Sequence, residues 1–80
     1  MKLNEYLKQA RTKSGLTQFS VAGELGLHVQ YISNVERGAC NIPVKILNTY
    51  IKMCGASKAT IIKIMIKDHK EVLTNLLVDK

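Results

Sequence analysis

The 80-residue sequence has few of the residues that build disulfide-bonded or strand-rich folds: two cysteines, one proline, no tryptophan and 5% aromatic residues. Two cysteines in a chain whose first residues lack a secretory pattern indicate a reducing cytoplasm rather than a secreted disulfide scaffold. The two cysteines and two separated histidines give no metal-ligand spacing, so we expect no metal and no other cofactor. The longest apolar runs, such as residues 64–66, are far too short to span a membrane.

Length and composition exclude further classes. A chain of 80 residues forms one small domain, too small for a two-domain enzyme or a deep substrate cavity, so we expect no enzymatic activity. Apolar residues make up 46% of the chain, which favours a folded helical protein over a disordered one. The net charge of +6 is spread along the sequence and suits a polyanion such as DNA, although charge alone indicates only non-specific attraction.

Apolar residues recur at three- and four-residue spacing, which predicts an all-α fold. The first helix is expected over residues 3–13, the second ends before Gly26, the third covers residues 28–36 and the fourth residues 43–54. The inward residues predicted for the fourth helix are Val44, Leu47, Tyr50, Ile51 and Cys54.

A fifth helix is expected to begin at Ser57, and a capping-box pattern at Asp68 and Glu71 predicts the start of a sixth. We interpret these two acidic residues as caps rather than as an acid and base pair. The sequence therefore predicts a single domain over residues 1–80, with a core in residues 1–57 and a C-terminal helical extension in residues 58–80.

The segment from Leu16 to Gly38 contains two short predicted helices separated by one glycine-containing turn, as in a helix-turn-helix. Thr17 is expected to cap the first of them, and Ala22 is small enough to let the two helices approach closely. Four apolar side chains are expected to fix their crossing angle: Leu25, Leu27, Ile32 and Val35. The second helix then protrudes and can enter a DNA major groove, which is about 12 Å wide.

Several short motifs lie at characteristic spacings between residues 11 and 57. They are Arg11, Leu16-Thr17-Gln18, Ala22, Leu25-Gly26, Tyr31-Ile32-Ser33, Glu36-Arg37-Gly38 and the helix from Leu47 to Ser57. On these residues the sequence resembles the phage repressor and Cro group of regulators, the Xre-like family. Controller proteins of restriction-modification systems are similar in length and in their fourth helix. The resemblance implies a five-helix repressor-like DNA-binding domain in a cytoplasmic transcriptional regulator.

The resemblance also implies roles for individual residues. The expected base readers are Val29, Gln30 and Asn34, since Gln and Asn amides can bind adenine at two points and valine can pack against a thymine methyl. The expected DNA-backbone contacts are Thr17, Gln18, Tyr31, Ser33, Arg37, Asn41 and Lys45. Arg11 and Glu36 are expected to form a structural ion pair between the first and third helices. Because the reading helix has no Lys or Arg before Arg37, we expect A·T-leaning contacts.

Three positions depart from the family pattern. His28 stands where the third helix usually has a capping Ser or Thr, Phe19 replaces a typical Glu or Ala, and Gly23 lies inside the second helix at a cost of about 1 kcal/mol relative to alanine. The two cysteines also receive different interpretations: Cys54 is expected in the core as a small hydrophobic residue, and Cys40 in an exposed loop.

The apolar residues of the extension exceed what a small core can cover. Ile61, Ile62 and Met65 are expected to pack in the core. The surplus residues predict a homodimer interface formed by Ile66, Val72, Leu73, Leu76 and Leu77. A two-fold dimer would present two reading helices about 34 Å apart, so the predicted operator is a pseudo-palindrome.

Two other functions remain open at this stage. An antitoxin-like protein would neutralise a toxin-like partner through its C-terminal apolar residues and autoregulate its operon. A non-specific DNA-coating protein would show little sequence preference. As a regulator, the protein would either block RNA polymerase or recruit it. The expected partners are thus double-stranded DNA, a second copy of the chain, and RNA polymerase or a toxin-like protein, with no membrane.

Overall fold

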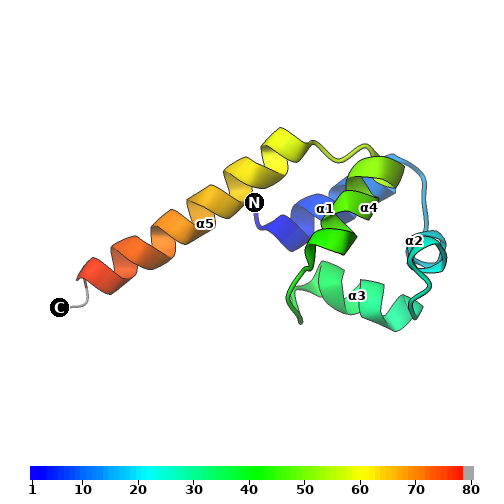
Figure 1. Cartoon of the computed structure of the whole chain (residues 1–80), viewed down its shortest axis with the longest axis horizontal. Coiled ribbons are helices and arrows are strands. Elements are labelled where there is room, and N and C mark those ends of the chain that lie inside the picture. The colour runs from blue at the N-terminus through cyan, green and yellow to red at the C-terminus, as the bar shows by residue number, and fades with distance from the viewer. Residues whose placement is uncertain (79–80) are drawn as a thin grey trace.

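The computed structural model describes the backbone of residues 1–78 and the side chains of residues 1–68. Within that range, every regular element is an α-helix: α1 (Leu3–Lys13), α2 (Gln18–Leu25), α3 (Val29–Arg37), α4 (Val44–Cys54) and α5 (Lys58–Val78). The first four helices form a cluster, and α5 leaves it as a straight rod (Figure 1). The predicted all-α fold with five helices is confirmed.

Local sequence signals set the helix boundaries around the turn between α2 and α3. The Thr17 hydroxyl accepts a hydrogen bond from the backbone N–H of Ser20 at 3.0 Å and caps the start of α2. Gly26 follows α2 with a φ of 67°, in the left-handed region that costs other residues about 1–2 kcal/mol. His28 occupies the N-cap position of α3, but its side chain makes no capping hydrogen bond.

The core lies where α1, α2, α3 and α4 meet. Its fully buried large side chains come from all four helices: Leu7, Val21, Ile32, Val35, Ile46 and Tyr50. From α5 the core receives Ile61, which is 3% exposed. Cys54 is also buried, as predicted, and burial raises the pKa of its thiol. Since α3 packs on both α1 and α2, its orientation is set by the rest of the cluster.

The predicted inward face of α4 is wrong at its first residue. Val44 is 70% exposed, whereas Ile46 is buried. The helix begins at Val44, so this residue lies beyond the edge of the core, and the buried positions are Ile46, Leu47, Tyr50 and Cys54. Leu27, in the turn between α2 and α3, is also only partly covered, at 38% exposure.

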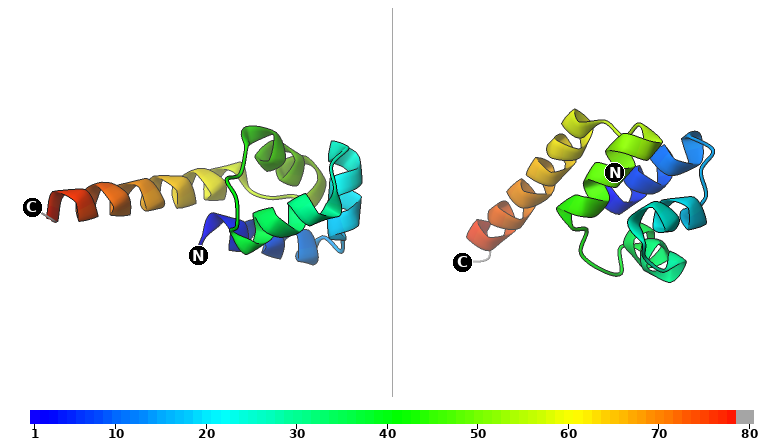
Figure 2. Two further views of the ribbon diagram at one scale, coloured as in Figure 1. Left: turned by 90° about the horizontal axis from the view of Figure 1, so that it is seen from below. Right: turned by 45° about the vertical axis from the view of Figure 1, so that its right-hand side comes forward.

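The predicted sixth helix is also wrong, because α5 continues through Asp68 and Glu71 as one helix. No glycine or proline lies between Lys58 and Val78, so nothing in the segment terminates a helix. The rod projects from the cluster in every view, and the molecule measures 46 × 23 × 18 Å along its principal axes (Figures 1 and 2).

The side chains of α5 are less covered than the sequence indicates. Ile62 and Met65, expected in the core, are 46% and 48% exposed because the rod turns this face away from the cluster. Ile66 is 57% exposed beside them. The remaining predicted dimer residues lie outside the side chains that the structure describes: Val72, Leu73, Leu76 and Leu77. In the described part of the chain, no helix combines the length and hydropathy needed to cross a lipid bilayer.

Candidate nucleic-acid interface

The helix α3 lies along the lower edge of the cluster in Figure 1, and it crosses α2 steeply, since α2 is seen end-on in the same view. Ile32 and Val35 are fully buried and hold α3 onto the core. Residues on other sides of the helix reach solvent: Val29 is 42% exposed, and Gln30 is also exposed. The structure therefore leaves two of the three predicted base readers accessible at the N-terminal half of α3.

A chain of hydrogen bonds runs along the polar face of α3. The side-chain amide Nε2 of Gln30 donates to Oδ1 of Asn34 at 3.1 Å. Arg37 donates to the same oxygen from Nη2. Residues at positions i, i+4 and i+7 share one helix face, so their spacing could have predicted this contact. The third predicted base reader, half-buried Asn34, is thus held between two neighbours.

The carboxylate of Glu36, in the last turn of α3, joins all four helices of the cluster. Arg11 of α1 donates to it twice, from Nε to Oε2 at 2.7 Å and from Nη2 to Oε1 at 2.9 Å. Gln18 of α2 donates from Nε2 to Oε1 at 3.0 Å. Tyr50 of α4 donates from its hydroxyl to Oε2 at 2.5 Å. The sequence predicts the Arg11–Glu36 ion pair, which the structure contains, but not the two additional donors.

This network is buried and fully hydrogen-bonded. The side chains of Arg11 and Glu36 are 10% and 1% exposed. The remaining Nη1 group of Arg11 donates to the carbonyl oxygen of Leu16 at 2.8 Å, which fixes the loop before α2. Among the described side chains, no buried polar atom lacks a hydrogen-bond partner. The hydroxyl of a buried Tyr normally has a hydrogen-bond partner. The prediction that Tyr50 faces inward on the fourth helix is therefore the sequence signal that could have indicated a buried acceptor for its hydroxyl.

The protonation states follow from these contacts. Burial acts to raise the pKa of Glu36, but hydrogen bonds from Arg11, Gln18 and Tyr50 outweigh it and hold the pKa below its ordinary value. The hydrogen bond to Glu36 raises the pKa of Arg11. Burial and the same carboxylate raise the pKa of the Tyr50 hydroxyl. At neutral pH the network is therefore an ion pair with a protonated tyrosine as its third donor.

The start of α2 carries two of the predicted DNA-backbone contacts, and both already have partners within the chain. Thr17 caps α2, and one amide hydrogen of Gln18 is directed to Glu36. The second amide hydrogen of Gln18 remains available, and the side chain is half-buried. Phe19 beside them is 76% exposed, and nothing in the structure explains this aromatic residue.

Two further predicted backbone contacts meet beside α3. Tyr31 and Lys45 line an apolar cleft of about 380 Å³ between α3 and the start of α4, together with Leu27, Pro43 and Ile46. Asn41 is exposed in the loop that joins these two helices. The predicted exposure of Cys40 beside it is wrong, because this residue packs partly buried against the core. Ser33 is half-buried on α3. The cleft therefore brings Tyr31 of α3 and Lys45 of α4 together at one side of α3.

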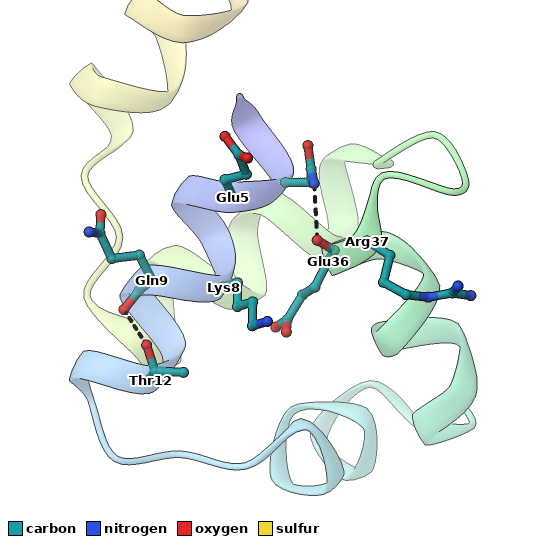
Figure 3. A pocket seen from close by; sticks show the side chains of 7 residues that line it. Glu5, Lys8, Gln9, Thr12, Glu36 and Arg37 are labelled. Carbon is teal, nitrogen blue, oxygen red and sulfur yellow. Dashed lines mark hydrogen bonds between the residues drawn. The ribbon is translucent and has the colours of Figure 1, made fainter. Parts of the chain in front are cut away.

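A second, polar groove of about 560 Å³ lies between α1 and the C-terminal end of α3 (Figure 3). Asn4 donates from Nδ2 to the carbonyl oxygen of Glu36 at 3.0 Å and thereby ties α1 to the end of α3. Thr12 donates to the carbonyl oxygen of Gln9 at 3.0 Å. Arg37 points away from α1 in this view, in agreement with its contact to Asn34.

Two helices that cross at a glycine turn, the second with an exposed polar face, define the class of helix-turn-helix DNA-binding proteins. A family model described as a helix-turn-helix domain matches residues 3–61. The chain belongs to this family, and it is a DNA-binding regulator of the Xre-like type, as its resemblance to the phage repressor and Cro group implied.

Solved structures of the restriction-modification controller protein C.Esp1396I are similar to this chain. The wild-type controller protein shares 29% sequence identity at a TM-score of 0.62, over 81% of this chain and 83% of its own. One mutant shares 28% identity at a TM-score of 0.61, over 81% and 87% of the two chains. Another shares 29% at 0.62, over 82% and 88%. No match is found among curated proteins.

Proposed function

We propose that the protein is a homodimeric, sequence-specific transcriptional regulator that inserts α3 into the major groove of a pseudo-palindromic operator and regulates its own operon. The observation that carries this proposal is the accessible polar face of α3 on a helix whose other side is anchored by buried contacts. The net charge of +6 attracts DNA at long range. The structural similarity to a restriction-modification controller protein supports a controlling role.

The chemistry and position of each side chain suggest whether it contacts bases or phosphates. Exposed side chains of α3 would contact base edges, whereas Arg37, Asn41 and Lys45 would bind phosphates at the end of α3, in the loop and on α4. Gln18, Tyr31 and Ser33 would add hydrogen bonds to the sugar-phosphate wall. Phosphate contacts set the register of the protein on the duplex, and base contacts set its sequence preference.

The homodimer rests on the exposed apolar face of α5. Ile62, Met65 and Ile66 lie on a helix that projects from the cluster, and an unpartnered apolar face of this kind is unfavourable in water. A second copy related by a two-fold axis would cover this face with an identical one. The same face would serve the antitoxin-like alternative, in which a different protein covers it.

Light scattering on the purified protein separates these two functions. A dimer mass for the protein alone supports the homodimeric regulator. A monomer at micromolar concentration contradicts the homodimer, and it favours a partner protein as the occupant of the α5 face.

Fluorescence anisotropy tests the DNA-binding proposal directly. The full-length protein is titrated at physiological salt against DNA from immediately upstream of its gene and against a shuffled duplex of equal length. We expect the upstream duplex to bind about a thousandfold more tightly. Equal, salt-sensitive binding to both duplexes, with no preferred sequence in a selection from random duplexes, would show a non-specific coating protein instead.

A further inference from the structure

The hydrogen-bond chain on α3 restricts what Asn34 can read. A side-chain amide has one carbonyl oxygen with two acceptor sites and one NH₂ group with two donors. In this structure, Nε2 of Gln30 and Nη2 of Arg37 both donate to Oδ1 of Asn34. The acceptor capacity of Asn34 is therefore fully used within the helix, and only its two N–H donors remain for DNA.

Gln30 keeps a different set of groups. It gives one amide hydrogen to Asn34, and its Oε1 atom and second amide hydrogen remain available. This is the donor and acceptor pair that binds the N6 and N7 positions of adenine. Two amides of the same chemical type, four residues apart, thus present different hydrogen-bonding patterns to the groove.

Guanine matches the donor-only pattern of Asn34. Its major-groove edge carries two acceptors, N7 and O6, whereas adenine presents an acceptor and a donor. To bind adenine at two points, Asn34 would have to release one of the bonds to Oδ1. The bond from Arg37 is charge-assisted and is the more costly of the two to break.

We infer that Asn34 reads guanine rather than adenine, with Arg37 as the positioning residue that holds its amide, while Gln30 reads a neighbouring adenine. This inference rests on the proposed function, because it assigns base preferences to the same reading helix. It replaces the A·T-leaning contacts that the absence of Lys and Arg before Arg37 led us to expect.

The test uses full-length wild-type protein and a selection from random duplexes, followed by dissociation constants for all four bases at each half-site position. The position read by Asn34 is the one whose preference disappears in Asn34→Ala. At this position we expect wild-type protein to prefer guanine over adenine roughly five- to hundredfold. Arg37→Ala frees an acceptor on Asn34, so the preference should move toward adenine by at least about fivefold.

Two matched variants separate positioning from charge. Arg37→Lys keeps a cationic donor and should retain the guanine preference. Lys45→Ala removes the same charge from α4 and should weaken all four duplexes by one common factor. Arg37 and Lys45 are exposed and Asn34 is half-buried, and circular dichroism checks that each variant is folded.

The outcomes that overturn the inference are distinct from those that overturn the proposed function. An adenine preference at the Asn34 position in wild-type protein, or an Arg37→Ala variant that weakens all four duplexes equally, overturns the guanine assignment alone. A selection that yields no preferred sequence overturns the proposed function, and the base assignment fails with it.

Discussion

Removing Arg11 should strongly destabilise the protein. In Arg11→Ala the buried Glu36 carboxylate keeps Gln18 and Tyr50 as donors but loses both bonds from the guanidinium, at 2.7 and 2.9 Å. Breaking a buried ion pair by removing one partner costs about 3–5 kcal/mol. At about 4–8 °C per kcal/mol for a domain of this size, the melting temperature should fall by at least about 12 °C.

The same reasoning predicts that an apolar replacement of the whole network is far less damaging. In the triple variant Arg11→Met, Glu36→Leu and Tyr50→Phe, no charge or hydroxyl is left buried without a partner. The amide of Gln18 is half-buried and can turn to water. Since apolar groups of similar volume often replace buried ion pairs at little cost, we expect the free energy of unfolding to lie within about 2 kcal/mol of wild type.

Urea denaturation followed by circular dichroism measures both variants, with wild-type protein as the reference. The reasoning is refuted if Arg11→Ala costs less than about 1 kcal/mol, because the pair would then behave as a surface salt bridge. It is also refuted if the triple variant is as unstable as the single one, since the loss would then come from packing rather than from an unpaired charge.

Three further predictions concern acid stability, helix α2 and the α5 face. The pKa of Glu36 is held below its ordinary value of about 4.5, so its contribution to stability is complete above that pH and is lost as the pH falls through the lowered pKa. The urea midpoint of the wild-type protein should therefore drop more steeply in acid than the midpoint of Glu36→Gln. Parallel curves for the two proteins would contradict this prediction. Gly23→Ala, in a helix with open space at the new Cβ, should stabilise the protein by about 1 kcal/mol. Gly26→Ala, at a φ of 67°, should destabilise it by about 1–2 kcal/mol. Equal shifts of the melting temperature in the two variants would show that backbone conformation does not determine the change in stability. Ile66→Glu should give a monomer by light scattering while Lys67→Glu leaves the dimer intact, and a dimeric Ile66→Glu would move the interface elsewhere.

The course of the chain through α1, α2 and α3 could be predicted because each boundary depends on neighbouring residues. Thr17 caps α2 through the backbone N–H of Ser20, three residues along the chain, and Gly26 provides a left-handed turn whatever surrounds it. The position of Val44 could not be predicted in this way, because apolar spacing gives a helix face but not how far the core extends along it. The capping pattern at Asp68 predicts a break that α5 does not have, because a local capping signal does not end a helix in a segment without glycine or proline.

The candidate interface shows the same division between local and long-range information. Family resemblance predicted base-reading residues in the segment that forms α3, and it paired Arg11 with Glu36, which the structure shows in contact. It did not show that Gln18 and Tyr50 converge on the same carboxylate, since the orientation of side chains on three helices depends on their packing. The resemblance also does not predict the contact of Arg37 with Asn34. It assigns Arg37 to the DNA backbone by its position in the sequence, whereas this long side chain can also reach Asn34 on the same helix.

The Glu36 network has a consequence for the kinetics of DNA binding. Since Arg11, Gln18 and Tyr50 fix α3 in the free protein, the conformational entropy of ordering this helix is lost during folding and not during association. Free and bound backbones should then differ little, by about 1 Å or less, so no slow rearrangement precedes docking. Operators that differ in sequence would be captured at similar rates and released at different ones. Glu36, a residue with no predicted contact to DNA, would therefore help to make residence time the quantity that distinguishes one site from another.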